Sequence, residues 1–198
     1  MKKTKTLREL KTEKRKNEIL REAINLLAEK GYERTTMEDV AYQLLMTKGS
    51  IYYYFENKEA MYFECNMMII EQSIDIVQSI YEADMSSEEK IHRLIYEYIL
   101  YQIEEKPVFS LANNLQHIFS EENFAEIVKK RDEFNSIVDK ILMQGVENNE
   151  FKILDIKMSR FIIMGALNSI QSWYKPEGSK SVHEIAEIFS TELLKTLK

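Results

Sequence analysis

The stretch Thr47-Lys48-Gly49-Ser50-Ile51-Tyr52-Tyr53-Tyr54-Phe55-Glu56-Asn57-Lys58 decides how the rest of the chain is interpreted. A short segment of hydroxyls and a lysine runs directly into three tyrosines, a phenylalanine and a second lysine. Hydroxyl, ammonium and phenol groups are donors that proteins use to bind phosphate oxygens and base edges. We therefore interpret this stretch as a DNA recognition helix. Half-buried tyrosines that pack a small bundle are the alternative, because aromatic runs are commonly packing.

The residues before this stretch predict two more helices. Apolar residues recur at helical spacing over residues 13–30, and a shorter helix is predicted over about 37–44. Thr35 with Glu38 three residues later suits a capping box at the start of the shorter helix, and Thr36 is a second candidate N-cap. Three short helices with a tight turn between the last two form a helix-turn-helix unit.

In such a unit the N-terminal residues of the last helix reach base edges in the major groove. Gly49 lets the backbone approach DNA closely, and Tyr52 and Tyr53 are placed to donate hydroxyls to phosphates. The residues predicted to turn inward are Ile51 and either Tyr54 or Phe55.

Composition predicts an all-α protein, because the 198 residues include only 2 Pro and 5 Gly. Apolar residues at helical spacing along the chain predict about nine helices. The single Cys65 cannot form an internal disulfide, which fits a reducing compartment. The longest apolar run, residues 161–167, is far shorter than the roughly 20 residues of a membrane span. We therefore expect a soluble cytoplasmic protein that has no membrane partner.

The charge is unevenly distributed along the chain. Residues 1–60 carry 13 Lys+Arg against 10 Asp+Glu, whereas the remainder carries 14 against 23. A basic end on an acidic body suits a protein whose one end meets a polyanion. The predicted division is a basic flexible arm over 1–12, a helix-turn-helix domain over 13–57 and a larger helical domain over 58–198.

The helix predicted over about 155–174 is apolar nearly all round, so it must be buried on more than one side. A second subunit would cover the extra face, which predicts a homodimer through a four-helix bundle with the last helix, about 181–197. A central core helix within one subunit is the alternative. The predicted interface residues are Phe161, Met164, Ile170, Ile185, Phe189 and Leu193.

Residues 13–61 resemble the DNA-binding domain of the TetR family of bacterial one-component repressors. The matching residues are Gly31-Tyr32, Thr35-Thr36, Asp39-Val40-Ala41, Thr47 through Phe55 and Asn57-Lys58-Glu59. One departure is Leu44-Leu45, where the family usually has a small residue followed by Gly. A leucine there implies either that no positive φ is needed or that the turn is strained.

The resemblance implies a ligand-responsive regulator, most simply a repressor, that binds a palindromic double-stranded operator as a dimer. The implied DNA-binding residues are Thr36, Thr47, Lys48, Gly49, Ser50, Tyr52, Tyr53 and Lys58. The larger domain would then bind a small lipophilic effector that releases the DNA. Ten Met and many aromatic residues make an adaptable apolar pocket possible.

Polar residues within apolar patterns are the candidate pocket residues, together with the only tryptophan: Gln102, Asn113, Gln116, His117, Asn168 and Trp173. Each of the polar ones is equally compatible with a solvent-facing position. The C-terminal pattern around Trp173-Tyr174 loosely resembles TetR-like regulators of fatty-acid metabolism, which implies an acyl-coenzyme A effector. A cationic drug-like molecule is the rival, because the larger domain is acidic.

Two other classes of protein compete with a ligand-responsive regulator. A helical enzyme is disfavoured because the three histidines lie on separate predicted helices and no glycine-rich phosphate loop or HExxH pattern occurs. The sequence thus predicts no cofactor and no metal site. A ligand-insensitive architectural DNA-binding protein remains open, and it would bind without sequence preference.

Overall fold

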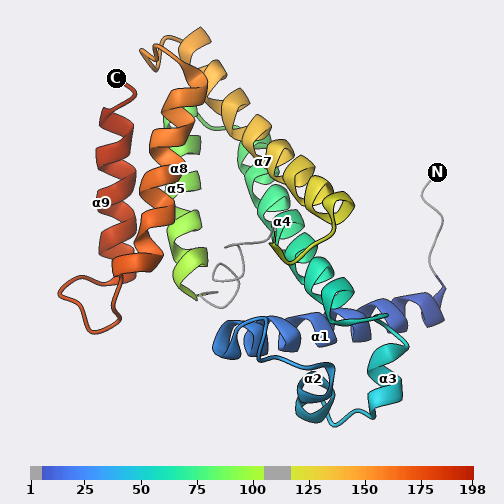
Figure 1. Ribbon diagram of the computed structural model, residues 1–198. Coiled ribbons are helices and arrows are strands. Elements are labelled where there is room, and N and C mark those ends of the chain that lie inside the picture. The colour runs from blue at the N-terminus through green and yellow to red at the C-terminus, as the bar shows by residue number, and fades with distance from the viewer. Residues whose placement is uncertain (1–5, 105–116) are drawn as a thin grey trace. The chain divides into compact units, whose positions relative to one another are not determined.

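The computed structural model describes residues 6–104 and 117–198 (Figure 1). Within those residues the chain is all-helical, as predicted, and has eight helices and no strand. They are α1 (Leu7–Lys30), α2 (Met37–Gln43), α3 (Lys48–Tyr52), α4 (Lys58–Glu82), α5 (Ser87–Glu104), α7 (Glu121–Glu147), α8 (Ile156–Trp173) and α9 (Val182–Lys195). The sequence also predicts a helix that starts at Pro107, because Pro is tolerated in the first turn of a helix, and that segment lies outside the described residues.

The described chain packs as two compact units. The first contains residues 6–69 and 117–127, and the second contains residues 70–104 and 128–198. The first unit therefore extends beyond the predicted domain boundary at residue 57, because Met61, Tyr62 and Cys65 of α4 are buried in it. The Cys65 thiol donates to the Leu20 carbonyl at 3.7 Å, which joins α4 to α1.

Helix α1 begins at Leu7, six residues before the predicted start at Glu13. Thr6 caps it: the Thr6 hydroxyl accepts from the Glu9 backbone N–H, and the Glu9 carboxylate accepts from the Thr6 N–H. Residues 7–12 of the predicted flexible arm are therefore helical. The helix ends at Gly31, whose φ of 81° favours glycine.

The capping box of α2 is one residue later than the predicted pair of Thr35 and Glu38. Thr36 is the N-cap, and its hydroxyl accepts from the Asp39 N–H at 3.1 Å. Thr35 is fully buried instead, and its hydroxyl donates to the Gly31 carbonyl at 2.9 Å. Because that hydroxyl is committed to the end of α1, it is not available to cap α2.

The turn between α2 and α3 places Leu45 in the left-handed region, with φ of 52°. The Met46 N–H donates to the Ala41 carbonyl at 2.8 Å, a hydrogen bond typical of a helix that ends at a left-handed residue. Of the two possibilities for Leu44-Leu45, a strained positive φ is the one found. Ile51 is buried as predicted, and of the two alternatives Tyr54 and Phe55 it is Phe55 that is buried. These two side chains attach α3 to the rest of the unit.

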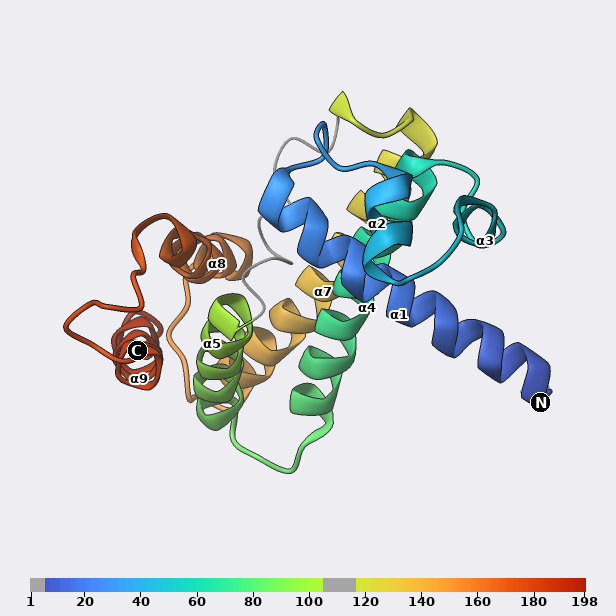
Figure 2. The same cartoon turned by 90° about the horizontal axis from the view of Figure 1, so that it is seen from below.

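In the second unit, α5 packs against both α9 and α8 (Figures 1 and 2). Its core is built from aliphatic residues of these helices and of α7, among them Ile95, Leu142, Leu167 and Leu194. Within the described residues, no helix is long and apolar enough to cross a membrane.

Candidate nucleic-acid interface

The N-terminus of α3 carries two neighbouring hydroxyl groups, those of the exposed Thr47 and the half-buried Ser50. Thr47 is the N-cap, and its hydroxyl accepts from the Ser50 N–H at 3.2 Å and lies 2.8 Å from the Ser50 hydroxyl. Gly49 lies between them, is exposed and has open space where a Cβ would stand. A close approach of another molecule to this backbone therefore meets no side chain at Gly49.

The four aromatic residues at the end of α3 and directly after it divide into two groups. Tyr53 is 71 % exposed and Tyr52 is also exposed, whereas Phe55 is buried and Tyr54 is half-buried. The Tyr53 ring meets the Tyr54 ring edge-on at 5.1 Å, which orients it without burying it. The two tyrosines predicted to face DNA, Tyr52 and Tyr53, are thus the two aromatic residues of this stretch that are exposed to solvent.

Lys48 forms an ion pair with Glu38 of α2, and its ammonium lies 5.7 Å from the centre of the Tyr52 ring. The hydrogen bond from Lys48 lowers the pKa of the Glu38 carboxyl, and the same bond raises the pKa of Lys48. Both side chains are exposed, so a phosphate group could compete for the ammonium at small cost.

Lys58 has internal contacts that sequence reasoning did not predict. Its ammonium donates to the Tyr32 carbonyl at 2.9 Å and lies 4.2 Å from the centre of the Tyr32 ring. Burial, followed by the charge of Glu59, raises the pKa of the Tyr32 phenol. Lys58 therefore holds the start of α4 against the end of α1, whatever else it binds.

Three exposed residues next to α3 were not predicted to face DNA: Glu38, Tyr42 and Leu45. Glu38 and Tyr42 are one helical turn apart on α2, so they share a face of that helix. The i,i+4 spacing was visible in the sequence, but the ion pair that joins this face to Lys48 was not.

The candidate pocket residues of the larger domain separate into several places. Gln102 and Asn168 come together: the Gln102 amide donates to the Asn168 side-chain oxygen at 3.4 Å, and the Tyr98 hydroxyl donates to the same oxygen at 3.2 Å. His117 is exposed, and Asn113 and Gln116 lie outside the described residues.

Tyr98 also lines a small cavity of about 20 Å³ between α4, α5 and α7. Burial raises the pKa of the Tyr98 phenol. Glu97 lines the same cavity, and its carboxylate accepts from Arg93 at 2.7 Å. The cavity wall thus carries a carboxylate that already has a cationic partner.

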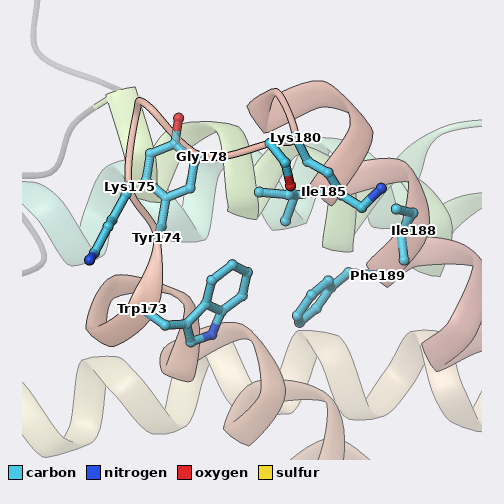
Figure 3. Close-up of a pocket in the computed structure, with 9 residues that line it drawn as sticks. Trp173, Tyr174, Lys175, Gly178, Lys180, Ile185, Ile188 and Phe189 are labelled. Atoms are coloured by element: carbon cyan, nitrogen blue, oxygen red, sulfur yellow. The ribbon is translucent and has the colours of Figure 1, made fainter.

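Trp173 lines a different and wider groove of about 400 Å³, formed by the end of α8, the following loop and α9. Its indole stacks on the Phe189 ring with centroids 5.9 Å apart. Figure 3 shows these two rings facing each other, with the Lys175 side chain pointing away from them.

The predicted interface residues also separate. Ile170, Ile185 and Leu193 are buried in the core of their own unit, whereas Phe161 is exposed and Met164 and Phe189 are half-buried. The exposed face of α8 also contains apolar residues that were not among the predicted interface residues. That face consists of Met158, Phe161, Ile162, Gly165 and Trp173.

Comparison with known proteins identifies both parts of the chain. Residues 19–65 match the model of bacterial regulatory proteins of the tetR family, and residues 84–197 match that of the tetracyclin repressor-like C-terminal domain. The HTH-type transcriptional repressor KstR2 of Rhodococcus jostii is 26 % identical over 185 residues, which cover 91 % of this chain and 89 % of KstR2.

Solved structures agree with this result. A TetR/AcrR family regulator from Thermobifida fusca is 29 % identical with a TM-score of 0.78, covering 93 % of this chain and 99 % of the other. AibR, solved in complex with isovaleryl coenzyme A and operator DNA, is 22 % identical with a TM-score of 0.74, covering 92 % and 97 %. These relatives are regulators and not enzymes, as predicted for this protein. The chain belongs to the TetR family of bacterial DNA-binding transcriptional regulators.

Proposed function

We propose that this chain is a repressor that binds a palindromic operator as a homodimer and is released by an acyl-coenzyme A. The exposed segment from Thr47 to Tyr53, at the start of a capped helix whose inner face is fixed by Ile51, carries the DNA-binding part of this proposal. The N-terminus of a helix attracts phosphate, and its first residues reach base edges when the helix lies in the major groove.

The proposed DNA-facing residues have distinct tasks. Gly49 allows close approach, while the hydroxyls of Thr36, Thr47 and Ser50 and the phenols of Tyr52 and Tyr53 donate to phosphates or bases. Lys48 exchanges its Glu38 partner for a phosphate. Lys58 acts chiefly through its contact with Tyr32, which orients the start of α4, and its charge adds to the attraction for DNA.

The exposed face of α8 supports the homodimer. Met158, Phe161 and Ile162 expose apolar side chains at helical spacing, and Gly165 has open space where a Cβ would stand. A second helix can approach closely at such a glycine. A symmetric dimer places one α3 on each half of a palindrome.

The group around Gln102 supports an acyl-coenzyme A as the effector. The Gln102 side chain is 1 % exposed, and its oxygen has no hydrogen-bond partner among the described residues. A buried acceptor without a donor is costly, and an amide N–H of the pantetheine arm would satisfy it. AibR, a relative of the same fold, was solved with isovaleryl coenzyme A.

Selection from a pool of random duplexes tests the DNA-binding part. We expect the full-length protein to enrich a palindrome and to bind it at least 1,000-fold more tightly than random DNA at the same salt concentration. Equal affinity for the selected and random duplexes would support an architectural DNA-binding protein instead.

Thermal melting with candidate effectors tests the second part. We expect palmitoyl-coenzyme A to raise the Tm and to release the selected duplex, and dodecyltrimethylammonium to do neither. Gln102→Leu should reduce the Tm shift, whereas Gln144→Leu, which alters a glutamine of α7 that bonds to Tyr81, should not. A Tm shift caused only by the ammonium compound would reverse the choice of effector.

A further inference from the structure

Two large side chains beside the recognition helix are almost fully exposed. Tyr42, in the last turn of α2, is 80 % exposed, and Leu45, in the turn before α3, is 94 % exposed. Neither side chain gains appreciably from burial in the free protein. Their contribution must therefore be sought outside the packing of the first unit.

The backbone at Leu45 makes the choice of leucine unfavourable for folding alone. Its φ of 52° puts the Cβ close to the following carbonyl, and glycine occupies most such positions at helix ends. The turn's hydrogen bonds, from Leu45 N–H to the Tyr42 carbonyl and from Met46 N–H to the Ala41 carbonyl, use only backbone atoms. Glycine would keep both bonds without the steric cost, so the leucine side chain has no evident role in the turn itself.

Tyr42 and Leu45 lie close to the start of α3. Tyr42 is one helical turn after Glu38 on α2, so the two share a face of that helix, and the Glu38 carboxylate pairs with Lys48 in the first turn of α3. Leu45 lies beyond the end of α2, two residues before Thr47, the N-cap of α3. Figure 1 shows the turn between α2 and α3 at the edge of the three-helix unit, on the side away from α1. Tyr42 and Leu45 thus extend the surface that α3 presents.

We propose that Tyr42 and Leu45 form an apolar DNA-reading element that contacts the C5-methyl groups of thymines next to the bases reached by α3. The proposal rests on the proposed function, because it assigns part of the base sequence that the regulator reads. The surface is continuous with the interface of α3, and the thymine methyl is the apolar group that a base edge offers in the major groove. The Tyr42 phenol can at the same time donate to a neighbouring phosphate.

The test uses the duplex selected by the full-length protein and copies of it in which deoxyuridine replaces one thymidine at a time. This replacement removes only the C5-methyl group. For the wild-type protein, we expect at least one replacement in each half-site to lower the affinity about fourfold, the effect of one buried methyl group. For Leu45→Gly, the same replacement should have no effect.

Leu45→Gly should also bind the unmodified duplex about tenfold more weakly, as expected when a contacting apolar side chain is removed. Its Tm should not fall, because glycine adopts the positive φ without strain. Tyr42→Ala should weaken binding in the same way. Leu154→Gly is the matched control, because Leu154 is an equally exposed leucine of the second unit, and it should leave the affinity unchanged.

Two failures can be told apart. If the wild-type protein selects no sequence, the proposed function fails. If it selects one, but neither deoxyuridine nor Leu45→Gly changes the affinity, only the apolar reading element is wrong. An affinity loss in Leu45→Gly accompanied by a fall in Tm would assign the residue to the stability of the turn and would also overturn the proposal.

Discussion

Helices α3 and α8 both expose large apolar side chains, but the surroundings of those side chains differ. On α3, Tyr52 and Tyr53 have polar phenols and lie beside Lys48 and the hydroxyls of Thr47 and Ser50. On α8, Ile162 lies in a face with a phenylalanine, a methionine and a glycine. Exposure alone does not name a partner. Phenols among cations and hydroxyls suit a polyanion, whereas aliphatic groups beside a glycine suit a second helix.

A charge on α8 should have the largest effect. Ile162→Glu places a carboxylate in the proposed dimer interface, where its desolvation is not compensated. We expect light scattering to give the mass of a monomer. Operator affinity should fall by roughly 100-fold or more, because the DNA-binding units of the two subunits are no longer linked. Met143→Glu, on the exposed side of α7, should leave the dimer intact. A dimeric Ile162→Glu protein would contradict the assignment of this face.

Removal of a tyrosine from α3 should have the next largest effect. Tyr53→Ala should lower operator affinity about 30-fold, as expected for a central aromatic contact. Circular dichroism and the dimer mass should be unchanged, because the side chain is largely exposed. The operator affinity of Tyr53→Phe should lie between that of the wild-type protein and that of Tyr53→Ala, since this variant keeps the ring and loses the hydroxyl. Undiminished affinity in Tyr53→Ala would remove this residue from the DNA interface.

The two lysines should give different kinds of effect. Lys48→Ala should reduce the slope of log affinity against log salt concentration by about 1, because one phosphate contact is lost. Lys58→Ala should lower the stability of the first unit by about 1 kcal/mol, because the Tyr32 carbonyl loses its charged donor. Salt titration of DNA binding and urea unfolding separate the two. A salt slope that changes only in Lys58→Ala would reverse the roles.

The smallest effect concerns the carboxylates that cap helices, one of which occurs in each unit. Hydrogen bonds from the Thr36 hydroxyl and backbone N–H lower the pKa of Asp39 in the first unit, and those from the Ser181 backbone and hydroxyl lower the pKa of Glu184 in the second. A carboxyl group whose pKa is lowered by folding stabilises the fold fully at pH values above its ordinary pKa, here 3.8 for Asp and 4.5 for Glu. That contribution is lost as the pH falls through the lowered pKa.

We therefore expect the Tm to fall below about pH 4.5, and to fall less in Asp39→Asn and Glu184→Gln than in the wild-type protein. Melting curves recorded from pH 7 to pH 3 measure this difference. Identical pH profiles in all three proteins would show that neither cap contributes to acid sensitivity.

The sequence predicted features that depend on local patterns. The inward position of Ile51 follows from helical spacing, and the three-helix unit follows from caps and turn residues. The same spacing left Tyr54 and Phe55 as alternatives, and Phe55 is the buried one. The start of α1 was missed because residues 7–12 have few apolar residues, so only the pairing of Thr6 with Glu9 indicated it. Two adjacent threonines made the cap of α2 ambiguous.

Contacts between distant residues could not be predicted. Lys58 and Tyr32 are 26 positions apart, and Gln102 and Asn168 are 66 apart, so no local pattern connects them. The apolar spacing of Ile170, Ile185 and Leu193 is the same whether they pack within one subunit or between two. Which residues cover them depends on the fold as a whole.

The reactivity of the buried Cys65 reports how often the first unit opens. Its thiol is fully covered and donates to the Leu20 carbonyl, and burial raises its pKa, so a thiol reagent cannot react with it while α1 and α4 remain packed. The rate of labelling at this single position therefore measures how often the DNA-binding unit opens. An operator duplex that holds the unit closed would slow that rate, and no cysteine would have to be introduced for the measurement.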